Sequence, residues 1–290
     1  MQNIYEETKF IMKKYNIKAN KSLGQNFLIS EEVVQNIIKA SEISKEDLII
    51  EIGPGLGTLT KYLLEEAGKV VCVELDIKML QILKDRFSIY SNFELINNDI
   101  LKEDLKELIK RQKQENEEIK NIKIVANLPY YITTPIIMKL LEEELEIKSI
   151  TVMIQKEVAD RLIAVPGEKD TGAITYSVYY YADSKAILEV PNYSFIPEPE
   201  VTSKVIRLDI RERKNVEFES IEEKEKVFKI IKQSFTQRRK TLLNVLVNTK
   251  IVKDKIQGIE ILKQVGLDVN IRPEKVKLEE FVKICNIINN

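Results

Sequence analysis

Short apolar-rich runs alternate with amphipathic stretches through the first half of the chain. Each run is four or five residues long, which is typical of a strand buried on both faces. Between the runs, apolar residues recur at the three- and four-residue spacing of a helix with one buried face. Strands separated by helices favour βαβ crossovers and a mostly parallel sheet. We predict helices at 31–40, 59–67 and 77–87 and strands at 48–52, 70–73, 93–96 and 122–126.

The second half of the chain begins with strand-like runs and then turns to helical spacing. We predict strands at 150–154, 174–181 and 204–210, the last two as antiparallel neighbours, and an extended loop with three prolines at 190–203. From residue 220 the pattern predicts helices at 222–237, 240–248, 258–265 and 278–288. The change of pattern near 211–216 predicts two domains. The first, 1–211, is an α/β domain with a mostly parallel central sheet, and the second, 212–290, is small and all-helical.

The composition excludes several catalytic mechanisms, although it says little about the fold. The chain contains no histidine, which excludes mechanisms built on Ser-His, Cys-His or His-metal pairs. Its two cysteines, Cys72 and Cys285, lie far apart without metal-ligand spacing, so we expect no metal and a reducing cytoplasm. The apolar runs are far shorter than the about 20 residues of a membrane helix, so we expect no membrane partner. Catalysis must rely on positioning, on backbone groups, Asn, Asp or Tyr, or on a reactive cofactor.

Charge is distributed unevenly along the chain. Residues 212–290 hold 17 Lys and Arg against 12 Asp and Glu, whereas the preceding residues hold 28 against 34. A basic C-terminal segment that follows a more acidic stretch of sequence indicates a polyanionic partner. The run Arg238-Arg239-Lys240 falls at a junction between two predicted helices and is the candidate for phosphate contacts, with Lys21 and Lys13-Lys14 as further contributors.

The strongest local motif is EIGPGLG at 51–57, between a predicted strand and a predicted helix. Glycines at Gly53, Gly55 and Gly57 allow the backbone to turn tightly and to approach a ligand, and the following helix offers its N-terminus. The G-x-G-x-G spacing is tighter than the dinucleotide fingerprint and resembles motif I of S-adenosylmethionine-dependent methyltransferases. The resemblance implies that the methionine part of the cofactor lies against this loop.

Two carboxylates follow at the ends of the next two predicted strands. Glu74 ends VVCVE and is placed to accept both ribose hydroxyls of a nucleoside, as acidic residues do at this position in dinucleotide folds. Asp99 ends FELINND and is placed to accept a hydrogen bond from an adenine amine. Either residue alone is better read as a solvated strand end, but their joint placement favours a cofactor site.

The motif that specifies the reaction is Asn127-Leu128-Pro129-Tyr130, directly after the strand IKIVA. The lone pair of an exocyclic adenine amine is delocalised into the ring, so methylating it requires help. The Asn127 side-chain oxygen and the Leu128 carbonyl can accept hydrogen bonds from the amine and hold its nitrogen in line with an electrophilic methyl group. Pro129 stiffens the turn, and Tyr130 offers a face for stacking a splayed-out base.

Taken together, the motifs resemble those of the ribosomal RNA adenine dimethyltransferases, and more closely their bacterial small-subunit branch. The segments that carry the resemblance are KSLGQNFL (21–28), EIGPGLGTLT (51–60), VELD (73–76), NND (97–99), NLPYYITTPI (127–136), FIPEPEVTS (195–203), FTQRRKTLLN (235–244) and IRPEKVKLEEF (271–281). The resemblance implies a Rossmann-like class I methyltransferase domain over 1–211 and an RNA-binding helical domain over 212–290.

The resemblance also assigns site residues. It implies S-adenosyl-L-methionine contacts from Asn26, Leu28, Gly53, Glu74, Asp99 and Asn127, to which the glycine spacing adds Gly55. It places Asn127, Leu128 and Tyr130 around the target amine, with Phe195 as a second aromatic against the base, and Pro129 completes the predicted catalytic motif.

The expected function is dimethylation of two adjacent adenines in a 3′-terminal hairpin loop of small-subunit rRNA, with a role in small-subunit assembly. The expected partner is this rRNA within an immature 30S particle, and we expect a monomer without an obligate protein partner. Three alternatives stay open at this point: a large-subunit rRNA methyltransferase of the macrolide-resistance type, a DNA adenine methyltransferase, and a non-catalytic RNA-binding assembly factor on the same fold. The intact ligand positions argue against the last.

Overall fold

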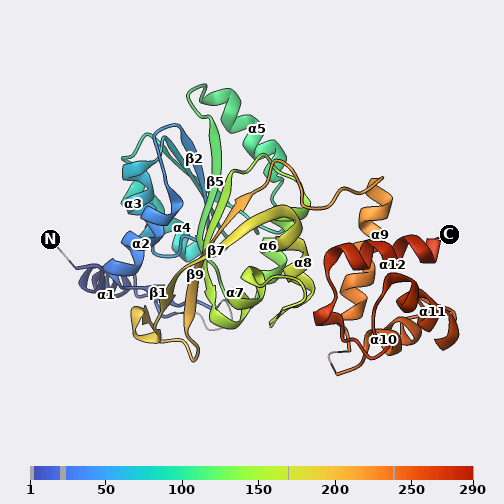
Figure 1. Cartoon of the computed structure of the whole chain (residues 1–290). Coiled ribbons are helices and arrows are strands. Elements are labelled where there is room, and N and C mark those ends of the chain that lie inside the picture. Colours follow the sequence, from blue (N-terminus) through green and yellow to red (C-terminus); the bar gives the residue numbers. More distant parts are fainter. Residues whose placement is uncertain (1–2, 20–23, 169, 238, 290) are drawn as a thin grey trace. The chain divides into compact units, whose positions relative to one another are not determined.

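The computed structural model of the chain describes residues 3–19, 24–168, 170–237 and 239–289 (Figure 1). The chain divides into two compact units, Met1–Ala159 with Ser184–Ile210, and Asp160–Asp183 with Arg211–Asn290. The second unit therefore holds, besides the predicted helical segment, a stretch that precedes it by about thirty residues in sequence. Whether 1–211 and 212–290 act as separate cofactor-binding and RNA-binding domains stays a prediction.

The first unit is built around a seven-stranded sheet in the order β4-β3-β2-β5-β6-β9-β7. The strands are β2 (Asp47–Ile52), β3 (Lys69–Glu74), β4 (Phe93–Asn97), β5 (Asn121–Asn127), β6 (Ser149–Gln155), β7 (Ala182–Val190) and β9 (Ser203–Ile210). Strands β2 to β6 are parallel to one another, and β9 is antiparallel to β6. The predicted mostly parallel sheet is confirmed.

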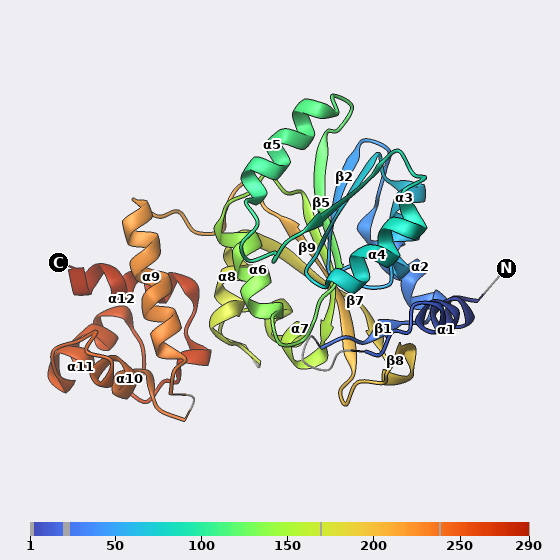
Figure 2. The ribbon, with the colours of Figure 1, turned by 180° about the vertical axis from the view of Figure 1, so that it is seen from behind.

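Helices cover this sheet on both sides (Figures 1 and 2). In chain order the helices of this part are α1 (Ile4–Lys14), α2 (Glu31–Ser41), α3 (Thr58–Glu66), α4 (Ile77–Phe87), α5 (Leu105–Glu115) and α6 (Thr133–Glu142). Apolar faces of α1 to α4 form one hydrophobic cluster with residues of β2, β3, β5, β6 and β9. A separate two-stranded sheet pairs β1 (Phe27–Leu28) with β8 (Phe195–Ile196), which follows the 3₁₀ turn Asn192–Ser194.

The strand order sets the position of a ligand site. The chain runs from β2 to β3 and β4 on one side, and then returns to place β5 on the other side of β2. The carboxyl ends of β2 and β5 therefore flank a topological switch point, where open α/β sheets bind their ligands. The glycine-rich segment follows β2, Glu74 ends β3, and Asn127 ends β5, so three of the predicted site positions meet at one edge.

The second unit is helical. It contains α8 (Ala173–Tyr181), α9 (Ile221–Ser234), α10 (Leu242–Asn248), α11 (Lys255–Val265) and α12 (Leu278–Asn289), and α7 (Lys156–Ile163) leads into it. The buried Tyr176 hydroxyl donates to the backbone carbonyl oxygens of Pro273 and Val276, at 3.1 and 2.6 Å. The Tyr176 ring packs edge-on against Phe281, with centroids 5.4 Å apart. The four helices predicted beyond residue 220 are present with shifted ends.

The strand predicted at 174–181 is wrong, because this stretch is helix α8. Its β-branched and aromatic residues favour a strand locally, but most of them are buried around the helix, which erases helical periodicity. The Thr175 side chain fixes the helix start by accepting from the Gly172 N–H at 2.9 Å and donating to the Arg161 carbonyl at 2.6 Å. The strand beside β9 is instead β7, which begins where α8 ends.

Gly57 is the position where the loop most needs glycine. Its φ is +81°, and a Cβ there would lie 2.4 Å from the Phe87 ring. Gly57→Ala is expected to lower the free energy of unfolding by about 2–4 kcal/mol, from left-handed strain and crowding together. Gly266→Ala is the matched control, because Gly266 has φ +85° and open space around it. It should cost only about 1 kcal/mol in urea unfolding. Equal costs would show that Phe87 does not constrain the loop.

Candidate active site

A cleft opens at the switch point between β2 and β5. Four segments line it: 24–28 around β1, the glycine-rich segment after β2, the ends of β3 and β4, and the start of the β5–α6 connection. The sequence-predicted residues that line the cleft are Asn26, Leu28, Gly53, Gly55, Glu74, Asp99, Asn127, Leu128, Pro129 and Tyr130. The fold thus brings together residues that are up to about a hundred positions apart.

The glycine-rich loop and Glu74 are joined directly. Gly53, Gly55 and Gly57 all have positive φ, and the Gly55 N–H donates to Glu74 Oε2 at 3.2 Å. The other carboxylate oxygen, Oε1, accepts from the Asp76 N–H at 2.8 Å. Burial raises the pKa of the Glu74 carboxyl, while its backbone donors act in the opposite direction. A buried carboxylate in this setting is suited to accept hydroxyl groups of a ligand that replaces water.

Asp99 lies in the turn after β4. One of its carboxylate oxygens accepts from the Leu101 N–H at 3.0 Å, and its N–H donates to the Asn98 side chain at 2.8 Å. Asn97 links this turn to β3 by donating from its amide to the Glu74 carbonyl at 2.9 Å. The Asn97 side chain therefore ties the turn that carries Asp99 to the end of β3, where Glu74 lies.

The segment after β5 is fixed at several points. The Leu128 N–H donates to the Met153 carbonyl at 3.1 Å, and Thr133 Oγ1 donates to the Pro129 carbonyl at 3.0 Å. The Asn127 amide nitrogen donates to the backbone carbonyl of Asn26 at 3.3 Å, which orients the side-chain oxygen as the acceptor end. The Tyr130 and Ser203 hydroxyl oxygens are 2.6 Å apart, and burial raises the pKa of Tyr130.

The N-terminal segment 24–28 closes the cleft from another side. Gln25 Nε2 donates to Asp76 Oδ2 at 2.8 Å, and Asn26 Nδ2 donates to the Gly24 carbonyl at 3.2 Å. In the β1–β8 pair, Leu28 lies opposite Phe195. Sequence spacing alone gives no reason to select these residues, because their position depends on contacts with segments far along the chain.

The ribosomal RNA adenine dimethylase family model matches residues 16–290 of this chain. The chain belongs to this family.

Curated relatives of the dimethylase are similar over nearly the full length. The ribosomal RNA small subunit methyltransferase A of Alkaliphilus oremlandii is 46% identical over 281 residues, 97% of this chain and 96% of the relative. The protein of the same name from Clostridioides difficile is 46% identical over 286 residues, 98% of this chain and 96% of the relative. The resemblance read from the sequence is therefore confirmed, and with it the methyltransferase activity and S-adenosylmethionine as cofactor.

Two solved structures share the fold of this dimethylase. A dimethyladenosine transferase from Plasmodium falciparum is 24% identical, with a TM-score of 0.71 over 91% of this chain and 97% of that one. The 23S rRNA methyltransferase ErmE is 21% identical, with a TM-score of 0.65 over 91% of this chain and all of that one. The predicted Rossmann-like class I fold is confirmed.

The structure places one predicted site residue of the dimethylase away from the cleft surface. Phe195 is 1% exposed and belongs to the hydrophobic core, where it pairs with Leu28 across the small sheet. Stacking of its ring against a base stays a prediction that would require this segment to move. One aromatic that sequence reasoning missed is Tyr131, which is 57% exposed and lines the cleft. Its position directly after Tyr130 is the sequence feature from which it could have been predicted as a site residue.

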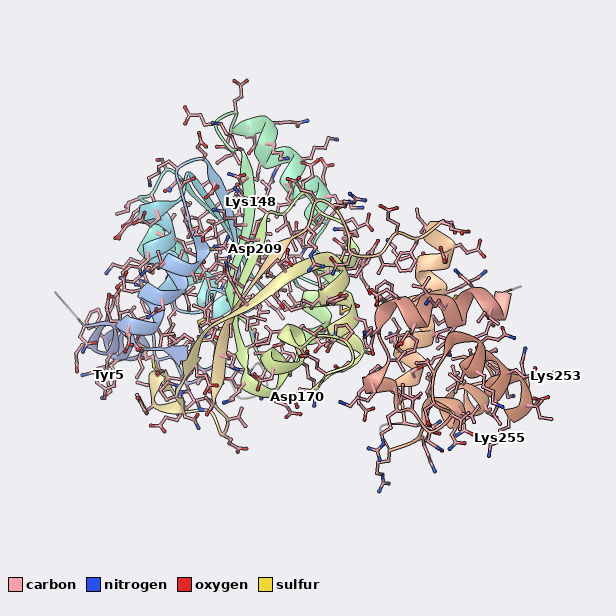
Figure 3. The ribbon with its side chains drawn as sticks, in the orientation of Figure 1. Tyr5, Lys148, Asp170, Asp209, Lys253 and Lys255 are labelled. Atoms are coloured by element: carbon pink, nitrogen blue, oxygen red, sulfur yellow. The ribbon has the colours of Figure 1, made fainter. Side chains whose placement is uncertain are left out.

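The basic run of the dimethylase is only partly described. Arg239 and Lys240 are exposed between α9 and α10, whereas Arg238 and Lys21 lie outside the described residues. Lys253 and Lys255, which flank the start of α11, also lie at the surface of the second unit (Figure 3). Contact of Arg239 and Lys240 with phosphates stays a prediction.

Two features are absent from the residues that the structure describes. None of the helices there is long and apolar enough to cross a membrane. No group of three or more Cys, Asp or Glu side chains suited to hold a metal ion occurs in the described part of the chain.

Glu51 is a fully buried carboxyl below the glycine-rich loop. It accepts hydrogen bonds from Thr60 Oγ1 at 2.6 Å and Cys72 Sγ at 3.3 Å. Burial raises its pKa to about 7 from an ordinary 4.5, although both hydrogen bonds act to lower it and the Glu74 carboxylate adds to the rise. Both protonation states are therefore populated near neutral pH.

This pKa predicts a pH-dependent loss of stability. Because folding raises the pKa, the unfolded chain releases the Glu51 proton at a lower pH than the folded protein does, and the loss of stability develops between about pH 4.5 and about pH 7. Relative to Glu51→Gln, the unfolding free energy of the wild type should fall across this window and level off above it. Urea unfolding of the ligand-free protein at several pH values tests this, with the exposed Glu65→Gln as control. Parallel curves for wild type and Glu51→Gln would contradict it.

Proposed function

We propose that this dimethylase methylates the exocyclic amines of two adjacent adenines in a 3′-terminal hairpin loop of small-subunit rRNA, twice at each base. The observation that carries the proposal is the position of the Asn127–Tyr130 segment and the glycine-rich loop on one cleft, at the ends of β5 and β2. The small-subunit names of the curated relatives favour this substrate over large-subunit rRNA and DNA.

The residues of the cleft fit S-adenosylmethionine. Glu74 supplies a buried acceptor for the ribose hydroxyls, Asp99 an acceptor for the adenine amine, and the glycine-rich loop a close backbone approach for the methionine part. Asn26 and Leu28 close the same cleft. When bound, the cofactor supplies a methyl group on a sulfonium that departs as a thioether.

The protein residues orient the target nitrogen. The Asn127 side-chain oxygen and the Leu128 carbonyl accept the two N–H bonds of the amine, which turns its lone pair toward the methyl group. After the first transfer one N–H bond remains, and either acceptor can hold it for the second. The amine proton is lost to water, so the chain needs no general base. Tyr130, fixed through Ser203, and the exposed Tyr131 offer faces against which a splayed-out base can stack.

Phosphate contacts of the basic segment can be tested by charge removal. Arg239→Ala with Lys240→Ala is expected to weaken RNA binding by about tenfold and to make its salt dependence shallower, because two fewer counterions are released. Lys106→Ala with Lys110→Ala, on the exposed face of α5, is the control. Binding titrations at several salt concentrations measure the slope. An unchanged slope would place the phosphate contacts elsewhere.

The decisive experiment measures transfer of a radiolabelled methyl group from S-adenosylmethionine. The substrates are purified unmodified small subunits, large subunits and plasmid DNA, and the products are digested to nucleosides. We expect dimethyladenosine from small subunits alone. An immature 30S particle should be a better substrate than the finished subunit if the protein acts during assembly. Tight binding to small subunits without transfer would favour an assembly factor and overturn the proposed reaction.

A further inference from the structure

Helix α1 is connected to the glycine-rich loop through one partly buried arginine. Arg86, in the last turn of α4, donates from Nη1 to the backbone carbonyl of Leu56 and from Nη2 to the Glu7 carboxylate of α1. Leu56 lies between Gly55 and Gly57, inside the loop that lines the cleft. We propose that Arg86, held by Glu7, is a positioning residue for the cofactor loop, an inference that rests on the proposed function of that loop.

This ion pair differs from those on the surface. The Arg86 and Glu7 side chains are 15% and 25% exposed, so both lose much of their hydration. Burial lowers the pKa of Arg86, while the Glu7 carboxylate acts to raise it. Removing one partner from such a pair leaves a poorly solvated charge, which costs far more than breaking an exposed pair. Glu7 therefore determines how firmly Arg86 can hold the loop.

The next residue of α4 supports the same loop. The Phe87 ring occupies the space beside Gly57 that a Cβ would need, and the Arg86 guanidinium lies 4.8 Å from the centroid of that ring. Two consecutive residues of α4 thus restrain two consecutive residues of the loop. Restraint is needed because glycines at positive φ have many accessible backbone conformations, and ordering them on binding would cost affinity.

Helix α1 is itself anchored on this part of the fold. Glu7 also lies 3.7 Å from the Lys61 ammonium of α3, and the Tyr15 hydroxyl donates to Asp85 Oδ2 at 3.0 Å. Ile4 and Ile11 of α1 are in the hydrophobic cluster. The family model begins at residue 16, after this helix. These contacts attach α1 to the part of the fold that carries the cofactor loop.

Direct binding of S-adenosylmethionine, measured by titration calorimetry without RNA, tests the proposal. Arg86→Gln is expected to raise the Kd about tenfold, and Glu7→Gln about threefold. The double variant should be no worse than Arg86→Gln, because both changes act through one contact. Arg86→Lys keeps the charge but not the planar fork, so it should not restore the wild-type Kd. Glu6→Gln, on the exposed face of α1, is the matched control.

Steady-state kinetics separate positioning from general damage. The KM for S-adenosylmethionine should rise in parallel with the Kd, whereas the KM for rRNA and the kcat at saturating cofactor should stay within about twofold of wild type. If Arg86→Gln does not fold, Glu7→Gln carries the test by itself. A wild-type Kd in both single variants, or equal changes in both KM values, would overturn the proposal. Wild-type protein that binds the cofactor but transfers no methyl group would instead contradict the proposed function.

Discussion

Asn127→Ala is expected to lower the kcat of methyl transfer by roughly a hundredfold or more, while rRNA affinity changes by less than about threefold. The physical reason is that, in the proposed reaction, the Asn127 oxygen holds the amine that receives the methyl group, whereas the proposed RNA-binding surface is much larger. The Asn127 amide is already oriented by its bond to the Asn26 carbonyl, so the folded protein has paid most of the ordering entropy. Single-turnover methylation of small subunits, beside a binding titration, measures both quantities.

The control for this variant is Asn121→Ala. Asn121 begins β5, at the opposite end of the strand from Asn127, and its amide donates to the Asp47 carboxylate at 2.9 Å. This change removes the same side chain from the same strand without touching the cleft. We expect a loss of stability with little change in kcat. Equal loss of rRNA binding and transfer in Asn127→Ala would show that Asn127 holds the RNA and does not orient the amine.

Glu74→Ala is expected to raise the Kd for S-adenosylmethionine by about a hundredfold. The carboxylate accepts backbone hydrogen bonds from Gly55 and Asp76, and in the proposed complex it also accepts the ribose hydroxyls. Its removal leaves these donors without their acceptor and also releases the glycine-rich loop from β3. Calorimetric titration of the cofactor, without RNA, gives the Kd directly.

Glu94→Ala is the control for Glu74→Ala. Glu94 is a partly buried carboxylate in the adjacent strand, where it pairs with Lys69 at 3.4 Å and accepts from Gln112 at 2.8 Å, outside the cleft lining. We expect this variant to bind the cofactor like wild type. An unchanged Kd in Glu74→Ala itself would remove Glu74 from the cofactor site.

The sequence predicted the features that depend on local signals. Buried strands of four or five apolar residues, glycines at three alternate positions and the acidic strand ends all appear within short windows, and together they locate the switch point of the sheet. The strand prediction at 174–181 was wrong because a helix that is buried on nearly all sides has no polar face, and its sequence therefore shows no helical periodicity. The local residue preferences there favour a strand, whereas the buried surroundings hold a helix.

Other features depend on contacts that no window contains. The Glu7–Arg86 pair spans 79 positions, and the Asn26–Asn127 bond spans 101. The burial of Phe195 follows from its pairing with Leu28. The three prolines of 190–203 predict an extended loop and give no sign of this pairing. Residues 24–28 could be assigned only by resemblance, because their place in the cleft is fixed by the rest of the fold.

The bond between Asn127 and residue 26 has a consequence for mutational tolerance. Its acceptor is a backbone carbonyl, which every amino acid carries, so no substitution at position 26 deletes the group that orients the Asn127 amide. A saturation library at position 26 should therefore report only on the cofactor and on local backbone fit. At position 127, in contrast, the amide is needed both to make the bond and to present the oxygen, so a library there should accept almost nothing. The orientation of the Asn127 amide is therefore insensitive to the side chain at position 26 and depends entirely on the side chain at position 127.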